Sequence, residues 1–157
     1  MTEKAKPVPE GVQAVMPMLV CANPDEAIDF CRAVFHAEER VRRAADDGTV
    51  LHCALTISGA MFMLQRATGE VASRPPSKDG SSPVVIYVYL PDVDRAVERA
   101  EAAGATILTA LKTQFWGDRT ARIMDPAGHV WVVASRIQET TEKERVERWS
   151  SIRSGGG

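Results

Sequence analysis

Hydrophobic positions along this chain follow two periods, one typical of strands and one typical of helices. Apolar runs of strand length occur at residues 14–21, 50–57, 60–66, 83–90 and 129–134, with weaker ones at 39–44, 106–108 and 119–124. After residue 23 apolar side chains recur every three or four positions, at Ile28, Cys31, Val34 and Phe35. The same happens after residue 92, at Val93, Ala96, Val97 and Ala100. These periods predict the order β-α-β-β-β twice in succession.

A constant offset of 69 residues relates the two halves without a gap. It carries Asn23 to Asp92, Asp25 to Asp94, Gly48 to Gly117 and Gly59 to Gly128. One offset thus fits a helix start, a turn inside the unit and a turn near its end. Two copies of one supersecondary unit predict a pseudo-two-fold core with a cavity between the copies.

Residues that begin and end helices mark the unit boundaries. Asn23 and Asp92 are expected to cap the helices, Pro24 suits a first helical position, and Gly104 suits a helix end. A stretch rich in Pro, Ser and Gly separates the units. We therefore predict one structural domain made of a flexible N-terminus (1–11), a first module (12–66), a linker (67–81), a second module (82–136) and a C-terminal helix and tail (137–157).

The expected C-terminal helix has its own start signal and its own apolar stripe. Thr141 and Glu144 have capping-box spacing, and Val146, Trp149 and Ile152 fall on one side of the helix. Such a stripe packs either on its own domain or on a partner subunit.

Composition and charge narrow the class of protein. With 45% apolar and 25% charged residues and a net charge of −2, the chain is typical of a globular protein and has no basic patch for nucleic acid. The three cysteines form no C-x-x-C motif and no signal peptide is evident, so we expect reduced thiols and a cytoplasmic location. No apolar run approaches the roughly 20 residues that cross a membrane.

Several motifs carry a family resemblance over roughly residues 15–136. They are P-D-E-A-I-D-F (24–30), L-P-D-V-D-R-A-V-E-R-A-E-A-A-G-A (90–105), F-W-G-D-R (115–119) and M-D-P-A-G-H-V-W (124–131). Paired β-α-β-β-β modules with these motifs resemble the vicinal oxygen chelate superfamily, which includes glyoxalase I, extradiol dioxygenases and the fosfomycin- and bleomycin-resistance proteins. The resemblance implies an α+β fold in which two tandem βαβββ modules form a curved mixed sheet, with a concave cavity and helices on the outer face.

The resemblance also implies where a metal would sit, because ligands in the superfamily's metalloenzymes lie on the first and last strands of each module. The corresponding positions are Met16, Met63, Val85 and Val132, and the 69-residue offset relates them in two pairs. Divalent ions prefer imidazole, carboxylate or amide groups, and valine has no lone pair to offer. We therefore predict no metal and no cofactor, and a metal-free bacterial subgroup of the superfamily.

Other candidates for a metal or catalytic site are few. His36, His52 and His129 are scattered, and His129 follows a turn in which we expect it to form a hydrogen bond. No G-x-S-x-G motif occurs, and the cysteines have no evident activating partner. His52 would act as a base only if it faced the cavity. The sequence therefore identifies no catalytic residue.

Period-2 alternation predicts which side chains line the cavity instead. Methionines adapt to irregular ligands, tyrosines stack and keep a hydroxyl, and the F-W-G-D-R loop adds an aromatic and a cation. The opposite strand positions are expected to form the core, although the methionines could also fill a core with no cavity. The predicted ligand-binding residues are Met16, Met18, Met61, Met63, Gln65, Tyr87, Tyr89, Trp116, Arg119 and Val132.

These observations favour a metal-independent protein that binds a small apolar or aromatic molecule, similar to the bleomycin-resistance type. That resemblance implies a homodimer with ligand grooves lined by both subunits. Two alternatives stay open, a glyoxalase-like lyase or isomerase with a non-standard acid-base residue, and a dimeric scaffold with a vestigial cavity. Neither nucleic acid nor membrane is expected as a partner.

Overall fold

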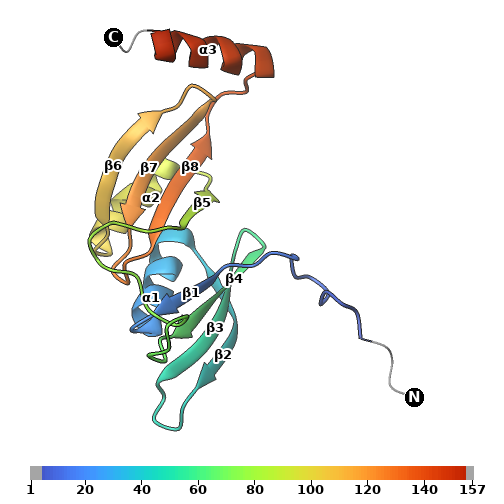
Figure 1. Cartoon of the computed structure of the whole chain (residues 1–157), viewed down its shortest axis with the longest axis vertical. Helices are drawn as coiled ribbons and strands as arrows, with labels where there is room; N and C mark the ends of the chain where they lie inside the picture. Colours follow the sequence, from blue (N-terminus) through green and yellow to red (C-terminus); the bar gives the residue numbers. More distant parts are fainter. Residues whose placement is uncertain (1–4, 155–157) are drawn as a thin grey trace.

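The computed structural model describes residues 5–154, which form two four-stranded sheets and three helices (Figure 1). The first module contains β1 (Met18–Cys21), α1 (Pro24–Phe35), β2 (Glu38–Ala44), β3 (Val50–Ile57) and β4 (Ala60–Arg66). The second contains β5 (Val85–Tyr89), α2 (Val93–Ala102), β6 (Thr106–Thr113), β7 (Asp118–Met124) and β8 (Val130–Arg136). Helix α3 (Glu142–Ser154) follows. The predicted α+β fold and the βαβββ order of both modules are confirmed.

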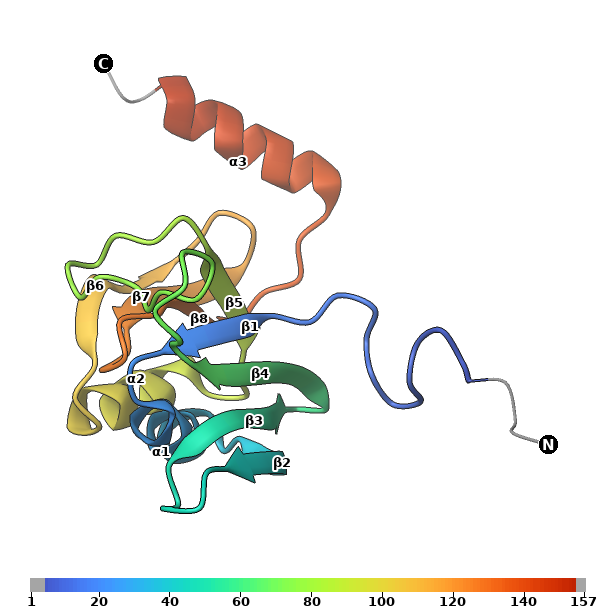
Figure 2. The ribbon, with the colours of Figure 1, turned by 60° about the horizontal axis from the view of Figure 1, so that its bottom comes forward.

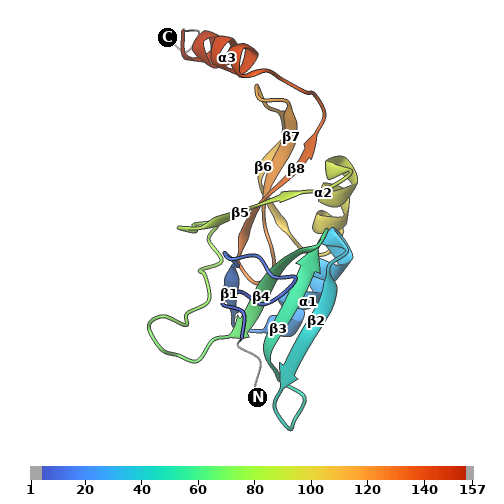
Figure 3. The ribbon, with the colours of Figure 1, turned by 90° about the vertical axis from the view of Figure 1, so that its right-hand side faces the viewer.

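Both sheets have the same strand order, β1-β4-β3-β2 in the first and β5-β8-β7-β6 in the second. In each, the first and last strands pair in parallel and the remaining pairs are antiparallel. Strands β1 and β5 are therefore edge strands, and residues of both line a hollow at the junction of the modules (Figure 2). Figure 3 shows both helices on the same side of the two sheets.

The repeated glycines hold equivalent turns. Gly48 and Gly117 have φ of 85° and 95°, and Gly59 and Gly128 have φ of 83° and 97°. Residues with side chains rarely adopt this left-handed region, which explains why glycine recurs at both offset pairs.

Two strand boundaries and one helix cap differ from the sequence prediction for local reasons. Strand β1 begins at Met18 rather than near Ala14, since Pro17 has no N–H to donate, although its carbonyl accepts from the Met63 N–H at 2.8 Å. Strand β6 runs to Thr113, beyond the predicted end, because its pairing with β7 shifts register after Ile107 and breaks the alternation. Asn23 occupies the cap position of α1 but its side chain makes no capping bond, whereas Asp92 accepts from the Arg95 N–H at 3.0 Å.

One hydrophobic core spans both modules. Helices α1 and α2 pack against each other, and the Trp131 side chain, only 1% exposed, lies beneath them. Its ring centroid is 4.8 Å from that of Phe35 and 5.9 Å from that of Phe62, both in the first module. The Trp131 Nε1–H donates to the buried Asp125 carboxylate at 2.9 Å, so its polar atom is satisfied. The predicted core face of the strands is confirmed here and at Leu19.

Helix α3 projects beyond the second module and buries none of its residues (Figure 1). Its predicted capping box is present, because the Glu144 N–H donates to Thr141 Oγ1 and the Thr141 N–H donates to the Glu144 carboxylate. No helix within residues 5–154 is long and apolar enough to cross a membrane.

Candidate functional site

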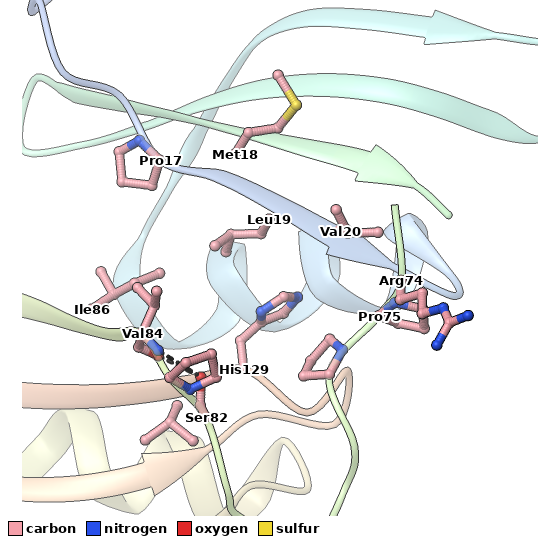
Figure 4. A pocket seen from close by; sticks show the side chains of 13 residues that line it. Pro17, Met18, Leu19, Val20, Arg74, Pro75, Ser82, Val84, Ile86 and His129 are labelled. Carbon is pink, nitrogen blue, oxygen red and sulfur yellow. Dashed lines mark hydrogen bonds between the residues drawn. The ribbon is translucent and has the colours of Figure 1, made fainter. Parts of the chain in front are cut away.

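Each sheet has one face that no helix covers, called here the helix-free face. Figure 4 shows the alternation in β1, where Leu19 points toward α1 and Met18 points the other way. Met18 is 47% exposed, and Met61, Met63 and Gln65 on β4 are partly exposed. Met16 precedes β1 and is partly exposed. The predicted first-module residues are thus at or beside one face, with β1 and β4 placing Met18 opposite Met63.

The helix-free face of the second sheet is aromatic. Tyr87 and Tyr89 on β5 are 44% and 51% exposed, and their ring centroids lie 5.2 Å apart. Val132 on β8 pairs with Tyr87 across the parallel ladder. Trp116, in the β6–β7 turn, points its indole N–H at the same group that the tyrosine hydroxyls contact.

That group is Asp118, a side chain with no exposed area that sequence reasoning did not single out. Its Oδ2 atom accepts hydrogen bonds from Tyr87 at 2.9 Å, Tyr89 at 2.7 Å and Trp116 Nε1 at 2.8 Å. Its Oδ1 atom accepts from Arg136 Nε on β8. Buried carboxylates need such partners, and these bonds fix the three aromatic rings relative to one another.

The electrostatics of the Asp118 cluster follow from these contacts. Burial alone would raise the pKa of Asp118, but the hydrogen bonds from Tyr89, Arg136, Tyr87 and Trp116 outweigh it and lower the pKa below its usual 3.8. Burial and then the hydrogen bond to Asp118 raise the pKa of Tyr87. The Tyr87 hydroxyl is therefore protonated at neutral pH, and both tyrosine hydroxyls donate their hydrogen bonds inward to Asp118.

The backbone of the β6–β7 turn holds Asp118 in place. Gly117 accepts hydrogen bonds from the N–H groups of Ile137 and Gln138 at 3.0 Å each. A Cβ atom at this glycine would lie 2.1 Å from the Gln138 carbonyl oxygen. The turn thus requires glycine both for its φ of 95° and for this close approach of two backbones.

A hollow of about 500 Å³ adjoins these aromatic residues on the second sheet. Its lining combines apolar strand residues with polar groups on β6 and β7, among them Thr109, Gln114, Thr120 and Arg122. Gln114 Nε2 donates to Thr120 Oγ1 at 2.8 Å, which fixes both side chains. An apolar concave surface with a small number of fixed polar groups is typical of small-molecule sites.

Arg119 does not line this hollow, and its predicted contact with a ligand stays a prediction. Its guanidinium makes a bidentate ion pair with Asp94 on α2, with N–O distances of 2.8 Å. Odd-numbered residues of β7, including the buried Ala121 and Ile123, face the helices, while Asp118 and Arg122 face the other way. Asp118 and Arg119 therefore belong to opposite faces and do not form a pair.

A second hollow, of about 560 Å³, lies between the F-W-G-D-R loop and α3. The Phe115 and Trp149 rings are 5.3 Å apart, and Arg148 Nη1 donates to the Phe115 carbonyl at 3.1 Å. Val146 and Ile152 remain exposed. Trp149 of the α3 stripe thus meets the Phe115 ring of its own domain, and the role of the stripe at a partner subunit stays a prediction.

A third hollow, of about 550 Å³, lies at the module junction between β1, the linker and β8. Figure 4 shows the His129 ring in its middle, with Val84 and Ile86 on one side and Arg74 and Pro75 on the other. As predicted, His129 takes part in the preceding turn, where its N–H donates to Asp125 Oδ1 at 2.9 Å.

The His129 ring also has a partner that the sequence did not reveal. Its Nε2 atom is 3.5 Å from Cys21 Sγ, at the end of β1. Burial lowers the pKa of His129 and, together with the nearby Asp125 carboxylate, raises the pKa of Cys21 to about 12. The thiol is thus held protonated, and this cysteine–histidine pair lacks the thiolate that nucleophilic chemistry needs.

The structure brings no better metal ligand to the four predicted metal positions. The strand register places Met18 rather than Met16 opposite Met63, and Tyr87 rather than Val85 opposite Val132. None of these side chains offers imidazole or carboxylate. Within residues 5–154, no group of three or more His, Cys, Asp or Glu side chains is placed to hold an ion.

Comparisons with known proteins agree with this geometry. The family model for the Glyoxalase/Bleomycin resistance protein/Dioxygenase superfamily matches residues 13–133. The Mycobacterium bovis protein Mb0911c is 38% identical over 134 residues, which cover 83% of this chain and 88% of that protein.

Solved structures show the same fold. TioX from Micromonospora sp. ML1 is 31% identical with a TM-score of 0.62, over 80% of this chain and all of TioX. The fosfomycin resistance protein FosX from Listeria monocytogenes, solved with Mn(II) and sulfate, is 16% identical with a TM-score of 0.60, over 85% of this chain and 97% of FosX. The FosX likeness concerns the fold alone.

Proposed function

The chain belongs to the Glyoxalase/Bleomycin resistance protein/Dioxygenase superfamily, and from this premise we propose that it binds a small apolar or aromatic molecule without using a metal ion. Binding would sequester the ligand rather than convert it. The observation that carries the proposal is the pair of helix-free faces, one rich in methionine and one bearing Tyr87, Tyr89 and Trp116 around a buried carboxylate.

Side-chain chemistry on these faces supports binding over catalysis. Displacement of water from apolar and aromatic groups by a flat ligand makes the free energy of binding more favourable. Such binding requires no proton transfer. The positions that the family resemblance assigns to metal ligands carry thioether and aliphatic groups, which are poor partners for Mn(II), Ni(II) or Zn(II).

We further propose that a second copy of the chain completes the site. Small-molecule pockets bury most of their ligand's surface, whereas each helix-free face of one chain is open on one side. In a symmetric dimer the methionine-rich face of one chain would oppose the tyrosine-bearing face of its partner.

The enzyme alternative rests on one residue. His52 on β3 lies directly across from Gln65 on β4, so its side chain belongs to the helix-free face of the first sheet. A histidine there could act as a general base if a substrate reached it. The His52→Ala variant distinguishes the two functions. If the protein only binds its ligand, the ligand should be recovered unchanged from both the wild type and the variant. If His52 is a general base, the wild type should convert the ligand and the variant should not.

Fluorescence titration tests the main proposal. Trp116 emission should change with saturation as flat aromatic compounds are added, and the Trp116→Phe variant should lose most of that signal. Trp149→Phe is the matched control, since Trp149 lies on the α3 side of the loop. No saturable response across a panel of aromatic compounds would contradict the proposal.

Two further measurements test its parts. Sedimentation velocity should give a dimer, and a monomer that still saturates with ligand would refute the composite site. Elemental analysis of protein purified without chelator should give less than stoichiometric metal. A full equivalent of Mn, Ni, Zn or Fe would refute metal independence.

A further inference from the structure

The aromatic residues on the second sheet offer a ligand hydrogen-bond acceptors but no donors, and this restricts which chemical groups can bind there. Each tyrosine hydroxyl has one proton, and in both Tyr87 and Tyr89 that proton is donated to Asp118 Oδ2. The indole N–H of Trp116 is used in the same way. What remains for a ligand is the lone pairs of the two phenol oxygens and the electron-rich ring faces. Tyr87 and Trp116 line this end of the hollow, and the Tyr89 ring lies beside that of Tyr87. This end therefore accepts hydrogen bonds and has no aromatic donor to offer.

The other end of the same hollow has the opposite polarity. Arg122 lies on β7 four residues after Asp118, about 13 Å away along the strand, and on the same face of the sheet. Within residues 5–154 its guanidinium forms no ion pair or hydrogen bond, in contrast to Arg119 on β7 and Arg136 on β8. Thr109 on β6 adds a hydroxyl to the lining. Five N–H donors of Arg122 are therefore free to meet an acceptor or anionic group.

We propose that this site takes a planar aromatic ligand with a hydrogen-bond donor at one end and an acceptor or carboxylate at the other, its donor at Tyr87 and Tyr89 and its acceptor at Arg122. The inference rests on the proposed binding function and adds a ligand class and an orientation to it. Asp118 acts as the positioning residue, because its charge keeps both hydroxyl protons pointing inward. The Asp118–Arg136 pair is electrically balanced, so the tyrosine end discriminates by hydrogen bonding rather than by net charge.

Three related probes separate the two ends. 6-Hydroxy-2-naphthoate has a donor and a carboxylate, 6-methoxy-2-naphthoate lacks the donor, and methyl 6-hydroxy-2-naphthoate lacks the charge. Calorimetric titration of the full chain at pH 7.5 should give the hydroxy acid the highest affinity. Loss of one hydrogen bond should weaken the methyl ether about 3- to 10-fold, and loss of the ion pair should weaken the ester by a similar factor.

Variants assign each preference to its residues. The double variant Tyr87→Phe, Tyr89→Phe keeps the rings and should bring the hydroxy acid and its methyl ether to equal affinity. Arg122→Gln should instead remove the preference for the acid over the ester. Arg95→Gln is the control, because it removes a cation from α2, outside the lining of this hollow, and should leave both ratios as in the wild type.

The variant Asp118→Asn provides an independent check on polarity. An amide at this position can donate to the phenol oxygens, which frees the hydroxyl protons to face the ligand, so the methyl ether should gain relative to the phenol. If this variant does not fold, the phenylalanine variants still decide the matter.

The outcomes are distinct. Equal affinity of the hydroxy acid and its ether for the wild type would overturn the donor end, and an unchanged acid-to-ester ratio in Arg122→Gln would overturn the acceptor end. In both cases the proposed binding function would stand. Absence of binding by all three probes would overturn this ligand class, and the broader aromatic panel would then decide the binding function separately.

Discussion

The Nε2 atom of His129 lies 3.5 Å from the Sγ atom of Cys21, and this contact joins the end of β1 to the turn before β8. A cysteine beside a histidine is a common nucleophilic pair, yet here burial keeps the thiol protonated, with a pKa of about 12. The contact belongs to the interface between the modules and has no features of an activated site.

Thiol modification tests this interpretation. Cys21, Cys31 and Cys53 are all buried, and burial raises the pKa of each. We expect iodoacetamide at pH 8 to modify the native protein only as fast as it unfolds, and to modify all three thiols rapidly in guanidinium chloride. Mass spectrometry measures both rates. Rapid and selective modification of Cys21 in the native protein would show that the pair is activated.

Replacement of Trp131 should damage both modules at once. The Trp131→Ala variant removes a side chain that packs on Phe35 and Phe62, and we expect a loss of about 3–5 kcal/mol in the free energy of unfolding. Urea denaturation measures it. Trp149→Ala is the matched control, since Trp149 is 48% exposed, and should cost less than about 1 kcal/mol. Similar losses in the two variants would argue against a shared core.

The repeat offers a matched pair of glycine substitutions. Gly48→Ala and Gly117→Ala change equivalent turns with similar φ, but a Cβ at Gly48 meets nothing within 4 Å whereas one at Gly117 meets the Gln138 carbonyl oxygen. We expect Gly48→Ala to cost about 1–2 kcal/mol of stability. Gly117→Ala should cost clearly more and should weaken ligand binding, because the turn that carries Trp116 and Asp118 must shift. Equal costs in thermal denaturation would contradict this account of the turn.

Acidification should act on Asp118. Its pKa is lower in the folded state than its usual value of 3.8, so its contribution to stability is complete above that value and is lost as the pH falls below it. At pH 7 Asp118→Asn should cost about 1–3 kcal/mol, because the buried carboxylate that accepts from Tyr87, Tyr89 and Trp116 is replaced by an amide. The difference between wild type and variant should shrink from about pH 4 downward. A difference that stayed constant to pH 2 would mean that the carboxylate is not stabilised as described.

The fold was predictable because its signals are local and repeated. Strand and helix periods, Asp92 as a cap and glycines at turns with positive φ each specify their own element, and the 69-residue offset gave two independent observations of each. The predicted strand boundaries were wrong where a backbone or tertiary effect overrode the periodic pattern, as at Pro17 and in the irregular pairing of β6.

The site was predictable only in outline. Alternation placed Met18, Tyr87 and Tyr89 on the uncovered faces, but it revealed neither the role of Asp118 nor the pairing of Arg119 with Asp94. Alternation along β7 carried a usable signal, because the apolar Ala121 and Ile123 share Arg119's face and exclude Asp118 from it. The convergence of β5, β8 and the β6–β7 turn on one carboxylate is a long-range arrangement that no local pattern encodes.

The position of Trp131 has a consequence for how such a chain can arise and be divided. Although the halves repeat one plan, the indole of the second half rests on aromatic rings of the first, so neither half has a finished interior. A cut in the linker would leave each fragment with a bare apolar surface, and we expect the separated halves to aggregate or to recombine rather than persist alone. The covalent link between the halves thus keeps together two surfaces that are each incomplete without the other.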